Sequence, residues 1–216
     1  MSARTCPVCC SGQVYHFQQV EDRGYWRCRD CLAVFLEIEQ LPDLASERAE
    51  YDKHRNDPYD PGYRGFLSRL WELLKPRLPD RASGLDYGCG PGPALATMAV
   101  EQGFEVALYD PYYAPDAAAL THQYDFITCT EVAEHFHDPA SEFEKLDQLL
   151  RPGGWLGVMT EFQTEDSRFA RWHYRRDPTH VVFYREETLR RIAERYGWQV
   201  EFPRKDIALF HKPGPK

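Results

Sequence analysis

The glycine-rich segment at residues 85–93 constrains the fold more than any other part of the chain. It reads Leu-Asp-Tyr-Gly-Cys-Gly-Pro-Gly-Pro, so an acidic residue precedes alternate glycines where an apolar strand turns into a helix. A glycine lets backbone approach a ligand without an intervening Cβ, or adopts the positive φ of a tight turn. A dinucleotide site would have its third glycine at position 93, where this chain has proline. The segment therefore predicts a backbone cradle for a ligand other than NAD, with Pro93 opening the following helix.

Three further motifs follow the glycine loop in chain order. Asp110 closes the apolar run 104–110, residues 124–135 read Tyr-Asp-Phe-Ile-Thr-Cys-Thr-Glu-Val-Ala-Glu-His, and residues 150–155 read Leu-Arg-Pro-Gly-Gly-Trp. Together the four motifs span roughly the middle third of the chain, and their order resembles the class I S-adenosylmethionine methyltransferases. The Glu-Val-Ala-Glu-His part is similar to that of the ubiquinone-type O-methyltransferases. The resemblance implies a Rossmann-like α/β sheet with helices on both faces.

The same resemblance implies S-adenosylmethionine as cofactor and assigns roles to six residues. Asp110, at the carboxyl end of a strand, is expected to accept hydrogen bonds from the ribose hydroxyls, as acids do in dinucleotide folds. Asp86 is expected to orient the glycine turn or to reach the methionyl ammonium through water. Glu131 is expected to flank the methionine moiety. The glycines that give backbone access are Gly88, Gly90 and Gly92.

Two histidines are the candidate catalytic residues. By the resemblance, His135 faces the acceptor, where a histidine of near-neutral pKa could take the proton of a hydroxyl group. Glu131 and His135 are four residues apart and would share one face if a helix begins there. In the alternative interpretation His135 only makes a hydrogen bond within that helix. His180 lies in the segment 162–184, which is rich in aromatic and charged residues and resembles a substrate cap.

The cap segment allows two interpretations of its polar residues. His173, Asp177 and His180 have a spacing that could bind a metal, but Pro178 interrupts the helix that would align them. A polar pocket for an anionic or hydroxylated acceptor fits better. The arginines that could line it are Arg171, Arg175 and Arg176, unless they only form a solvated face.

The cysteines predict a separate metal site at the N-terminus. Five of the seven lie in the first 31 residues, as the pairs Cys6-x-x-Cys9 and Cys28-x-x-Cys31 with Cys10 as a spare. Cys10 could replace Cys9 as a ligand, although Cys9 has the better spacing. This spacing lets four thiolates converge on zinc, and short strands near residues 25–27 and 34–36 are typical of a zinc ribbon. Such a ribbon either packs on the catalytic domain or recognises substrate, and its metal would supply much of its folding free energy.

Short apolar runs alternate with helical segments from residue 84 onward, which is typical of a largely parallel sheet covered by helices. The expected strands are residues 84–87, 105–109, 124–128 and 155–160, followed by an antiparallel hairpin of residues 198–203 and 206–211. A helix is expected over residues 186–196, with Gly197 just after it. Only about 14 residues separate Asp110 from Asp125, which is short for the helix, strand and loop of the family.

We therefore expect three regions: a zinc ribbon at 1–40, a linker with lid helices at 41–82, and a methyltransferase domain at 83–216. In the linker, Ser46 is the expected N-cap of a short helix to Tyr51, and an apolar stripe predicts a helix over 63–74, ended by Pro76. The candidate lid residues, which could instead be surface aromatics that anchor a linker, are Tyr51, His54, Tyr59 and Tyr63.

Composition limits the function classes. The net charge of −8 disfavours a broad grip on nucleic acid, and no apolar run approaches the roughly 20 residues that span a bilayer. The N-terminus lacks the hydrophobic segment of a signal peptide, so a cytoplasmic protein is expected. The first expectation is methyl transfer to a small molecule, most readily to a hydroxyl oxygen. The alternatives are an RNA methyltransferase that uses the ribbon for recognition, and a non-catalytic cofactor-binding protein whose ribbon serves protein interaction.

Overall fold

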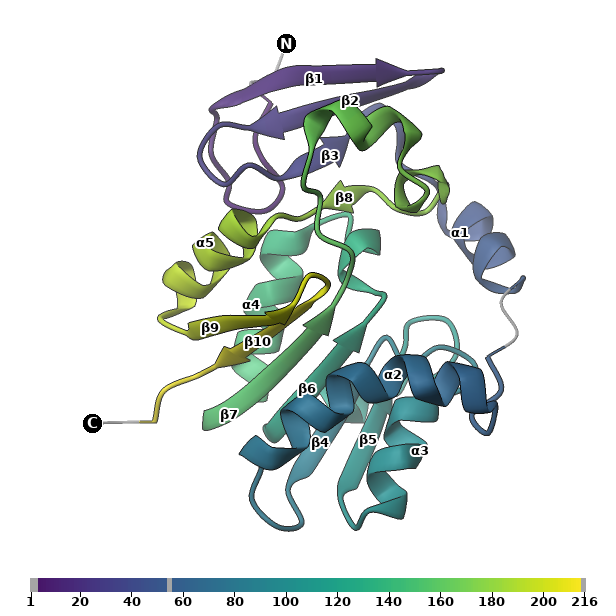
Figure 1. Ribbon diagram of the computed structural model, residues 1–216, viewed down its shortest axis with the longest axis vertical. Coiled ribbons are helices and arrows are strands. Elements are labelled where there is room, and N and C mark those ends of the chain that lie inside the picture. Colours follow the sequence, from purple (N-terminus) through teal and green to yellow (C-terminus); the bar gives the residue numbers. More distant parts are fainter. Residues whose placement is uncertain (1–3, 54–55, 215–216) are drawn as a thin grey trace.

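A six-stranded sheet forms the centre of the computed structural model, which describes residues 4–53 and 56–214 (Figure 1). In spatial order its strands are β5 (Glu105–Tyr109), β4 (Ser83–Tyr87), β6 (Tyr124–Thr130), β7 (Leu150–Met159), β10 (Ile207–His211) and β9 (Gln199–Arg204). The first four are parallel, whereas β10 runs antiparallel to both β7 and β9. The predicted parallel sheet with a terminal antiparallel hairpin is confirmed.

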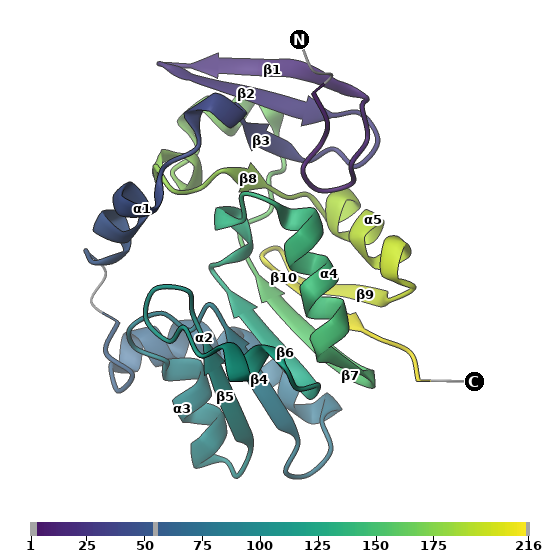
Figure 2. The ribbon, with the colours of Figure 1, turned by 180° about the vertical axis from the view of Figure 1, so that it is seen from behind.

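Helices cover both faces of this sheet, as expected for an α/β fold. Helices α2 (Pro61–Leu74) and α3 (Ala94–Glu101) lie on one face, and α4 (Pro139–Leu149) and α5 (Glu186–Tyr196) lie on the other (Figures 1 and 2). The apolar stripe of α2 is buried at Leu67, Leu70, Trp71 and Leu74. The second face is packed by Phe143, Leu146, Leu189 and Ile192 against Leu85, Ile127, Leu156 and Phe210.

Two predicted helix starts are wrong by a few residues. Helix α1 (Leu44–Tyr51) begins before Ser46, because the side chain of Asp43 is the N-cap and accepts a hydrogen bond from the Ser46 N–H at 2.8 Å. Pro93 is itself the N-cap of α3, with a ψ of 68°, and does not occupy the first helical position. The end of α5 is as predicted, with Gly197 in the left-handed region at φ 66°.

The N-terminal region forms a second, smaller sheet. Strands β1 (Val14–Val20), β2 (Arg23–Cys28) and β3 (Val34–Leu36) pair antiparallel, so the predicted ribbon strands are present. A fourth strand, β8 (Val182–Phe183), comes from the cap segment and pairs with β3. Helix α1 then leads from the ribbon toward α2 along one side of the molecule (Figure 1).

The short connection after Asp110 contains an antiparallel bridge between Asp110 and Ala114 and a 3₁₀ turn at Ala117–Leu120, but no α-helix. No further strand pairs outside β5 among the described residues, so β5 is an edge strand of the central sheet. None of the described helices has the length and apolar character to cross a membrane.

Candidate active site

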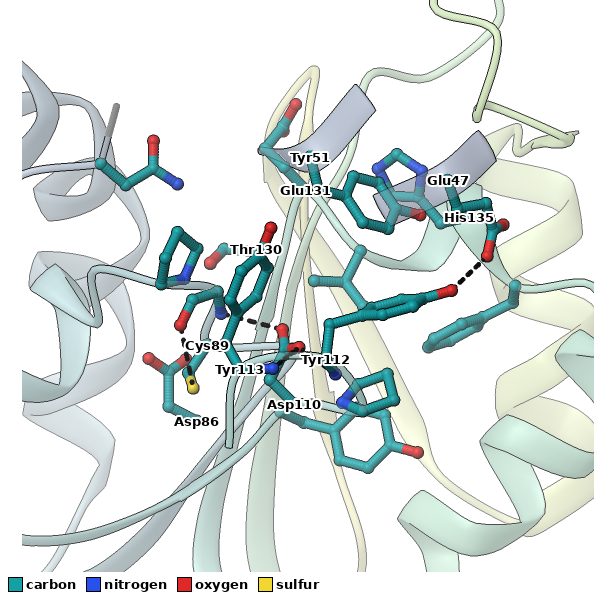
Figure 3. A pocket seen from close by; sticks show the side chains of 18 of the residues that line it. Glu47, Tyr51, Asp86, Cys89, Asp110, Tyr112, Tyr113, Thr130, Glu131 and His135 are labelled. Atoms are coloured by element: carbon teal, nitrogen blue, oxygen red, sulfur yellow. Dashed lines mark hydrogen bonds between the residues drawn. The ribbon is translucent and has the colours of Figure 1, made fainter. Parts of the chain in front are cut away.

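A cavity of about 890 Å³ opens at the carboxyl ends of β4, β5 and β6 (Figure 3). Ligands of open α/β folds bind at this edge, and the volume is in the range of small-molecule sites. Its lining comes from the glycine loop and the ends of these strands, from α1 and α2, and from residues 173–180 of the cap. The glycine loop, Asp110 and the end of the 124–135 motif therefore converge on one cavity, whereas none of residues 150–155 lines it.

The glycine loop brings bare backbone to one end of the cavity. Gly88 and Gly90 line it with φ values of 78° and 62°, which side chains rarely adopt. Gly92 has a different role, because a Cβ there would lie 1.6 Å from the carbonyl oxygen of Asn56. The linker backbone therefore rests directly on the loop, and only glycine permits that contact.

Two predicted acids lie beside this loop. Asp110 is 7% exposed, and its carboxylate accepts hydrogen bonds from the backbone N–H groups of Gly90, Tyr112 and Tyr113 at 2.8 to 3.0 Å. Asp86 is 3% exposed and accepts a hydrogen bond from Thr128 Oγ1 at 2.8 Å. Burial raises the pKa of Asp86 to about 6. Both carboxyl groups line the cavity (Figure 3).

Glu131 lies at the far end of β6 in a strained conformation. Its φ of 53° is in the left-handed region, at a cost of roughly 1–3 kcal/mol for a residue with a Cβ. The expected helix through Glu131 is absent, because the chain turns here into a 3₁₀ segment at Ala133–His135. Burial raises the pKa of Glu131 to about 9, and the nearby carboxylates of Glu134 and Glu161 add to this effect.

The two candidate catalytic histidines are brought together. The Nδ1 atom of His135 lies 3.0 Å from the Thr179 carbonyl oxygen, and Nδ1 of His180 lies 2.7 Å from that of Tyr174. A carbonyl oxygen only accepts hydrogen bonds, so each Nδ1 carries a proton and each neutral ring has an unprotonated Nε2. Burial lowers the pKa of His180, which favours its neutral form.

Glu134, which the sequence analysis did not single out, faces both histidines. Its Oε1 lies 3.9 Å from Nε2 of His135 and 3.9 Å from Nε2 of His180. Its side chain is 0% exposed, and neither carboxyl oxygen has a hydrogen-bond partner among the described residues. One ligand atom of each residue lies within 4.8 Å of the others. Such a set can hold a shared proton or a divalent cation.

Glu47 of α1 is a second lining residue that sequence reasoning missed. It is buried, accepts a hydrogen bond from Tyr112 Oη at 2.5 Å, and lies 2.8 Å from Nε2 of His137 (Figure 3). Burial by itself would raise the pKa of Glu47, but these two contacts bring it below its ordinary value. These polar contacts hold helix α1 beside the cavity. Because they produce no periodic pattern of apolar residues, the sequence did not indicate them.

The lid and cap predictions were only partly right. Tyr51 and Tyr63 line the cavity, Tyr59 is 70% exposed, and His54 lies outside the described residues. The expected arginine-lined pocket is wrong: Arg171 and Arg176 are exposed, and Arg175 is buried with Nη1 3.3 Å from Tyr25 Oη of the ribbon. The less favoured metal set of His173, Asp177 and His180 is not formed, since the His173 side chain is 75% exposed and pairs with Glu161.

The four predicted zinc ligands converge as expected. Sγ atoms of Cys6 and Cys31 are 3.6 Å apart and those of Cys9 and Cys28 are 3.5 Å apart, and all four lie within 4.8 Å of one another. Thiolates around zinc at about 2.3 Å would be roughly 3.8 Å apart, so the set fits a tetrahedral ion. Burial raises the pKa of Cys9 to about 12, so a cation is needed to hold it as a thiolate. Cys10 is exposed and outside the set.

Relatives of known sequence share part of this chain. It is 39% identical over 72 residues to the ubiquinone biosynthesis O-methyltransferase of Citrobacter koseri, covering 33% of this chain and 30% of that protein. The same enzyme of Aeromonas salmonicida is 36% identical over 78 residues, covering 36% and 33%. The chain thus matches about a third of the length of these relatives.

Solved structures extend the likeness to the fold. The 1,6-didemethyltoxoflavin-N1-methyltransferase of Burkholderia thailandensis, solved with 1,6-didemethyltoxoflavin and S-adenosylhomocysteine, superposes with a TM-score of 0.56 at 14% identity, covering 93% of this chain and 99% of that chain. A methyltransferase of Methanosarcina mazei gives 0.50 at 12% identity, covering 68% and 99%. The family described as "Methyltransferase domain" matches residues 51–201. With this match over most of its length, the chain belongs to the methyltransferase-domain family and has the fold of the class I S-adenosylmethionine-dependent methyltransferases.

Proposed function

We propose that the protein transfers a methyl group from S-adenosylmethionine to a small-molecule acceptor, with a hydroxyl oxygen as the favoured atom. The observation that carries this proposal is the negative lining of the cavity. Lys145 is the only lysine or arginine among the described lining residues, whereas eight carboxyl side chains line it. These are Glu47, Asp86, Asp110, Glu131, Asp138, Glu142, Glu161 and Asp177.

A cationic ligand suits this lining. The raised pKa values of Asp86 and Glu131, about 6 and about 9, belong to buried carboxyl groups without a nearby positive partner. S-adenosylmethionine carries a sulfonium and an ammonium group, and both would restore the charged carboxylates. The pyrophosphate of a dinucleotide would be repelled by the same groups. The N1-methyltransferase of Burkholderia thailandensis, which shares the fold, was solved with S-adenosylhomocysteine.

The proposed cofactor contacts follow from the positions of the residues. Gly88 and Gly90 present backbone, Asp110 lies beside them for the ribose, and Asp86 and Glu131 flank the methionine end. Gly92 supports the site by admitting the Asn56 backbone over the loop. When bound, the sulfonium supplies an activated methyl group, so the chain needs only to align the acceptor and to receive its proton.

The paired histidines support a hydroxyl acceptor. Each has its Nδ1 proton committed to a carbonyl, so Nε2 of His135 or of His180 is free to take the hydroxyl proton as the oxygen forms its bond to the methyl carbon. The carboxylate of Glu134 then stabilises the imidazolium that results. The curated relatives are described as ubiquinone biosynthesis O-methyltransferases, which fits oxygen as the acceptor atom.

The remaining regions have supporting roles in this proposal. Residues 1–40 are a zinc ribbon with Cys6, Cys9, Cys28 and Cys31 as ligands. Residues 41–82 are a linker and lid, and residues 83–216 are the methyltransferase domain with the cap at 162–184. The ribbon packs on the catalytic core, since its cysteines share one apolar cluster with α4 and α5.

Calorimetric titration tests the cofactor first. Zinc-loaded protein is titrated with S-adenosylmethionine, S-adenosylhomocysteine and NADH, and we expect micromolar binding of the first two only. Binding of NADH alone, or of none of the three, contradicts the proposal. A panel of phenols, catechols and aliphatic alcohols is then screened for a methyl mass shift, with matched amines as controls. Methylation confined to amines contradicts the oxygen assignment but keeps the cofactor assignment.

A further inference from the structure

Val181 connects the zinc ribbon with the histidine end of the cavity. Its backbone N–H donates a hydrogen bond to the Glu134 carbonyl at 2.9 Å, and its own carbonyl accepts one from the Leu36 N–H at 2.8 Å. The next residues form β8, in which Val182 and Phe183 pair with β3 of the ribbon. One peptide segment therefore makes the last strand of the ribbon sheet and the support of the turn that carries Glu134.

Both histidine rings are oriented by the segment that leads into β8. His135 is bonded through Nδ1 to the carbonyl of Thr179, and His180, which precedes Val181, is bonded to the carbonyl of Tyr174. Tyr184, at the other end of β8, donates through Oη to the Ala133 carbonyl at 2.8 Å and is fully buried. A shift of residues 179–184 would therefore displace both rings.

The ribbon side of this connection depends on the cysteine knuckles. Strand β3 has three residues and follows directly on the second knuckle, where the Cys28 N–H donates to the Ala33 carbonyl at 3.0 Å. Thr188 of α5 donates through Oγ1 to the Cys31 carbonyl at 2.7 Å. A ribbon of this size does not bury enough apolar surface to order itself, so the metal fixes the place of β3.

The cofactor end is built from other elements. Gly88, Gly90 and Asp110 belong to β4, to β5 and to the loops that follow them, and the ribbon lies at the opposite end of the molecule from these strands and α3 (Figure 1). Loss of the ribbon geometry should therefore change the orientation of the two histidine rings more than it changes the structure of the glycine loop.

We propose that the zinc ribbon is a positioning element of the acceptor site: the metal holds β3, β3 holds residues 181–183, and these hold His135 and His180 in their orientations. The identification of that end as the acceptor site rests on the proposed function. The positioning itself does not rest on it, because imidazole NMR signals and amide hydrogen exchange report the positioning without any acceptor.

The test uses the full chain and a matched pair of variants, Cys9→Ser and Cys10→Ser. Cys9 is one of the four converging thiols, whereas its neighbour Cys10 is exposed and outside the set. Zinc content, amide hydrogen exchange, imidazole NMR signals and S-adenosylhomocysteine affinity are measured for each. For Cys9→Ser we expect loss of zinc, exchange at least about tenfold faster at residues 179–184, and shifted or broadened signals of His135 and His180. Exchange at residues 88–96 and the S-adenosylhomocysteine affinity should stay within about threefold, and Cys10→Ser should match the parent.

A second variant breaks the connection with the zinc in place. Val181→Pro removes the N–H that Glu134 accepts, so the histidine signals should move while zinc content and S-adenosylhomocysteine binding persist. Unmoved histidine signals in this variant, or in Cys9→Ser after zinc loss, overturn the proposal. If Cys9→Ser loses protection from amide exchange throughout the chain, the whole protein has been destabilised. The histidine signals of Val181→Pro then decide whether the proposal stands. Absence of S-adenosylhomocysteine binding in the parent protein counts against the proposed function only, since the exchange and NMR results remain readable.

Discussion

The imidazole rings of His135 and His180 meet edge to face, with centroids 4.7 Å apart, and their Nε2 atoms lie at the same distance from one oxygen of Glu134. That carboxyl group has no hydrogen-bond partner among the described residues, so a positive charge formed on either ring would be stabilised by it. The pair is thus suited to receive a proton from a ligand in the cavity.

Replacement of either histidine should separate chemistry from cofactor binding. Of His135→Asn and His180→Asn, we expect the variant that lacks the proton-accepting ring to lower kcat about 100-fold or more with a hydroxyl acceptor, and the other to have a smaller effect. Affinity for S-adenosylhomocysteine should change by less than about threefold, since the cofactor end is untouched. His122→Asn is the matched control, because that side chain is exposed and does not line the cavity. Full activity in both of the first two variants would remove the histidines from the mechanism.

Cofactor affinity should depend on pH through Asp86. Burial raises the pKa of Asp86 to about 6, so the carboxylate is present above that pH and is progressively neutralised below it. A cationic ligand favours the carboxylate and lowers its pKa in the complex, so the contribution of Asp86 to affinity should be full above pH 6 and fall as the pH drops toward 5. Glu131, whose pKa is about 9, adds a separate rise in affinity at higher pH, in the parent and in Asp86→Asn alike. Asp86→Asn should bind more weakly at pH 7.5 and lose the fall toward pH 5. Calorimetry from pH 5 to 8 gives the answer, and a parent protein with constant affinity over this range would exclude the contact.

Much of the cofactor end was predictable because its signals are local. The turn of Gly88 and Gly90 and the acid at position 110 occur within a single strand–turn–helix and the next strand end, so sequence order sets their geometry. The carboxyl ends of parallel strands then gather at one edge of the sheet. The converging cysteines were also predictable, since two Cys-x-x-Cys pairs favour a tetrahedral site, and only the choice of Cys9 over Cys10 needed the structure.

The histidine end of the cavity was not predictable in the same way. Its geometry depends on β8, a strand of two residues whose pairing with β3 joins distant parts of the chain. No periodicity exists in so short a strand. Arg175 illustrates the consequence. As an arginine in the cap segment it was expected to line the pocket, but its side chain contacts Tyr25 of the ribbon. Glu134, whose carboxyl group has no hydrogen-bond partner among the described residues, can be recognised as part of the site only in the folded structure, where both histidines lie beside it.

A methyl group at position 92 should disturb the linker above the glycine loop. In Gly92→Ala the new Cβ would lie 1.6 Å from the Asn56 carbonyl oxygen, so one of the two backbones must move. We expect weaker S-adenosylhomocysteine binding, by about tenfold or more, and faster proteolysis at residues 56–60. Gly65→Ala, in helix α2 with open space around the new Cβ, is the control and should be neutral or slightly stabilising. Equal cofactor affinity in the two variants would show that the contact has no part in binding.

Asp110 holds the turn by its hydrogen bonds and is proposed to hold the ribose, and different substitutions should separate these two roles. Its carboxylate accepts three backbone hydrogen bonds, so Asp110→Ala should lower the free energy of unfolding by about 2 kcal/mol or more besides weakening the cofactor. Asp110→Asn keeps one oxygen for the Tyr112 and Tyr113 N–H groups and loses the acceptor for Gly90 and for a ribose hydroxyl. Its stability should therefore lie closer to that of the parent, while S-adenosylhomocysteine affinity falls about tenfold or more, or about 1.4 kcal/mol. Urea unfolding and calorimetry on both variants measure the two roles. Parent-like affinity in Asp110→Asn would mean that this carboxylate serves only the turn and that another group holds the ribose.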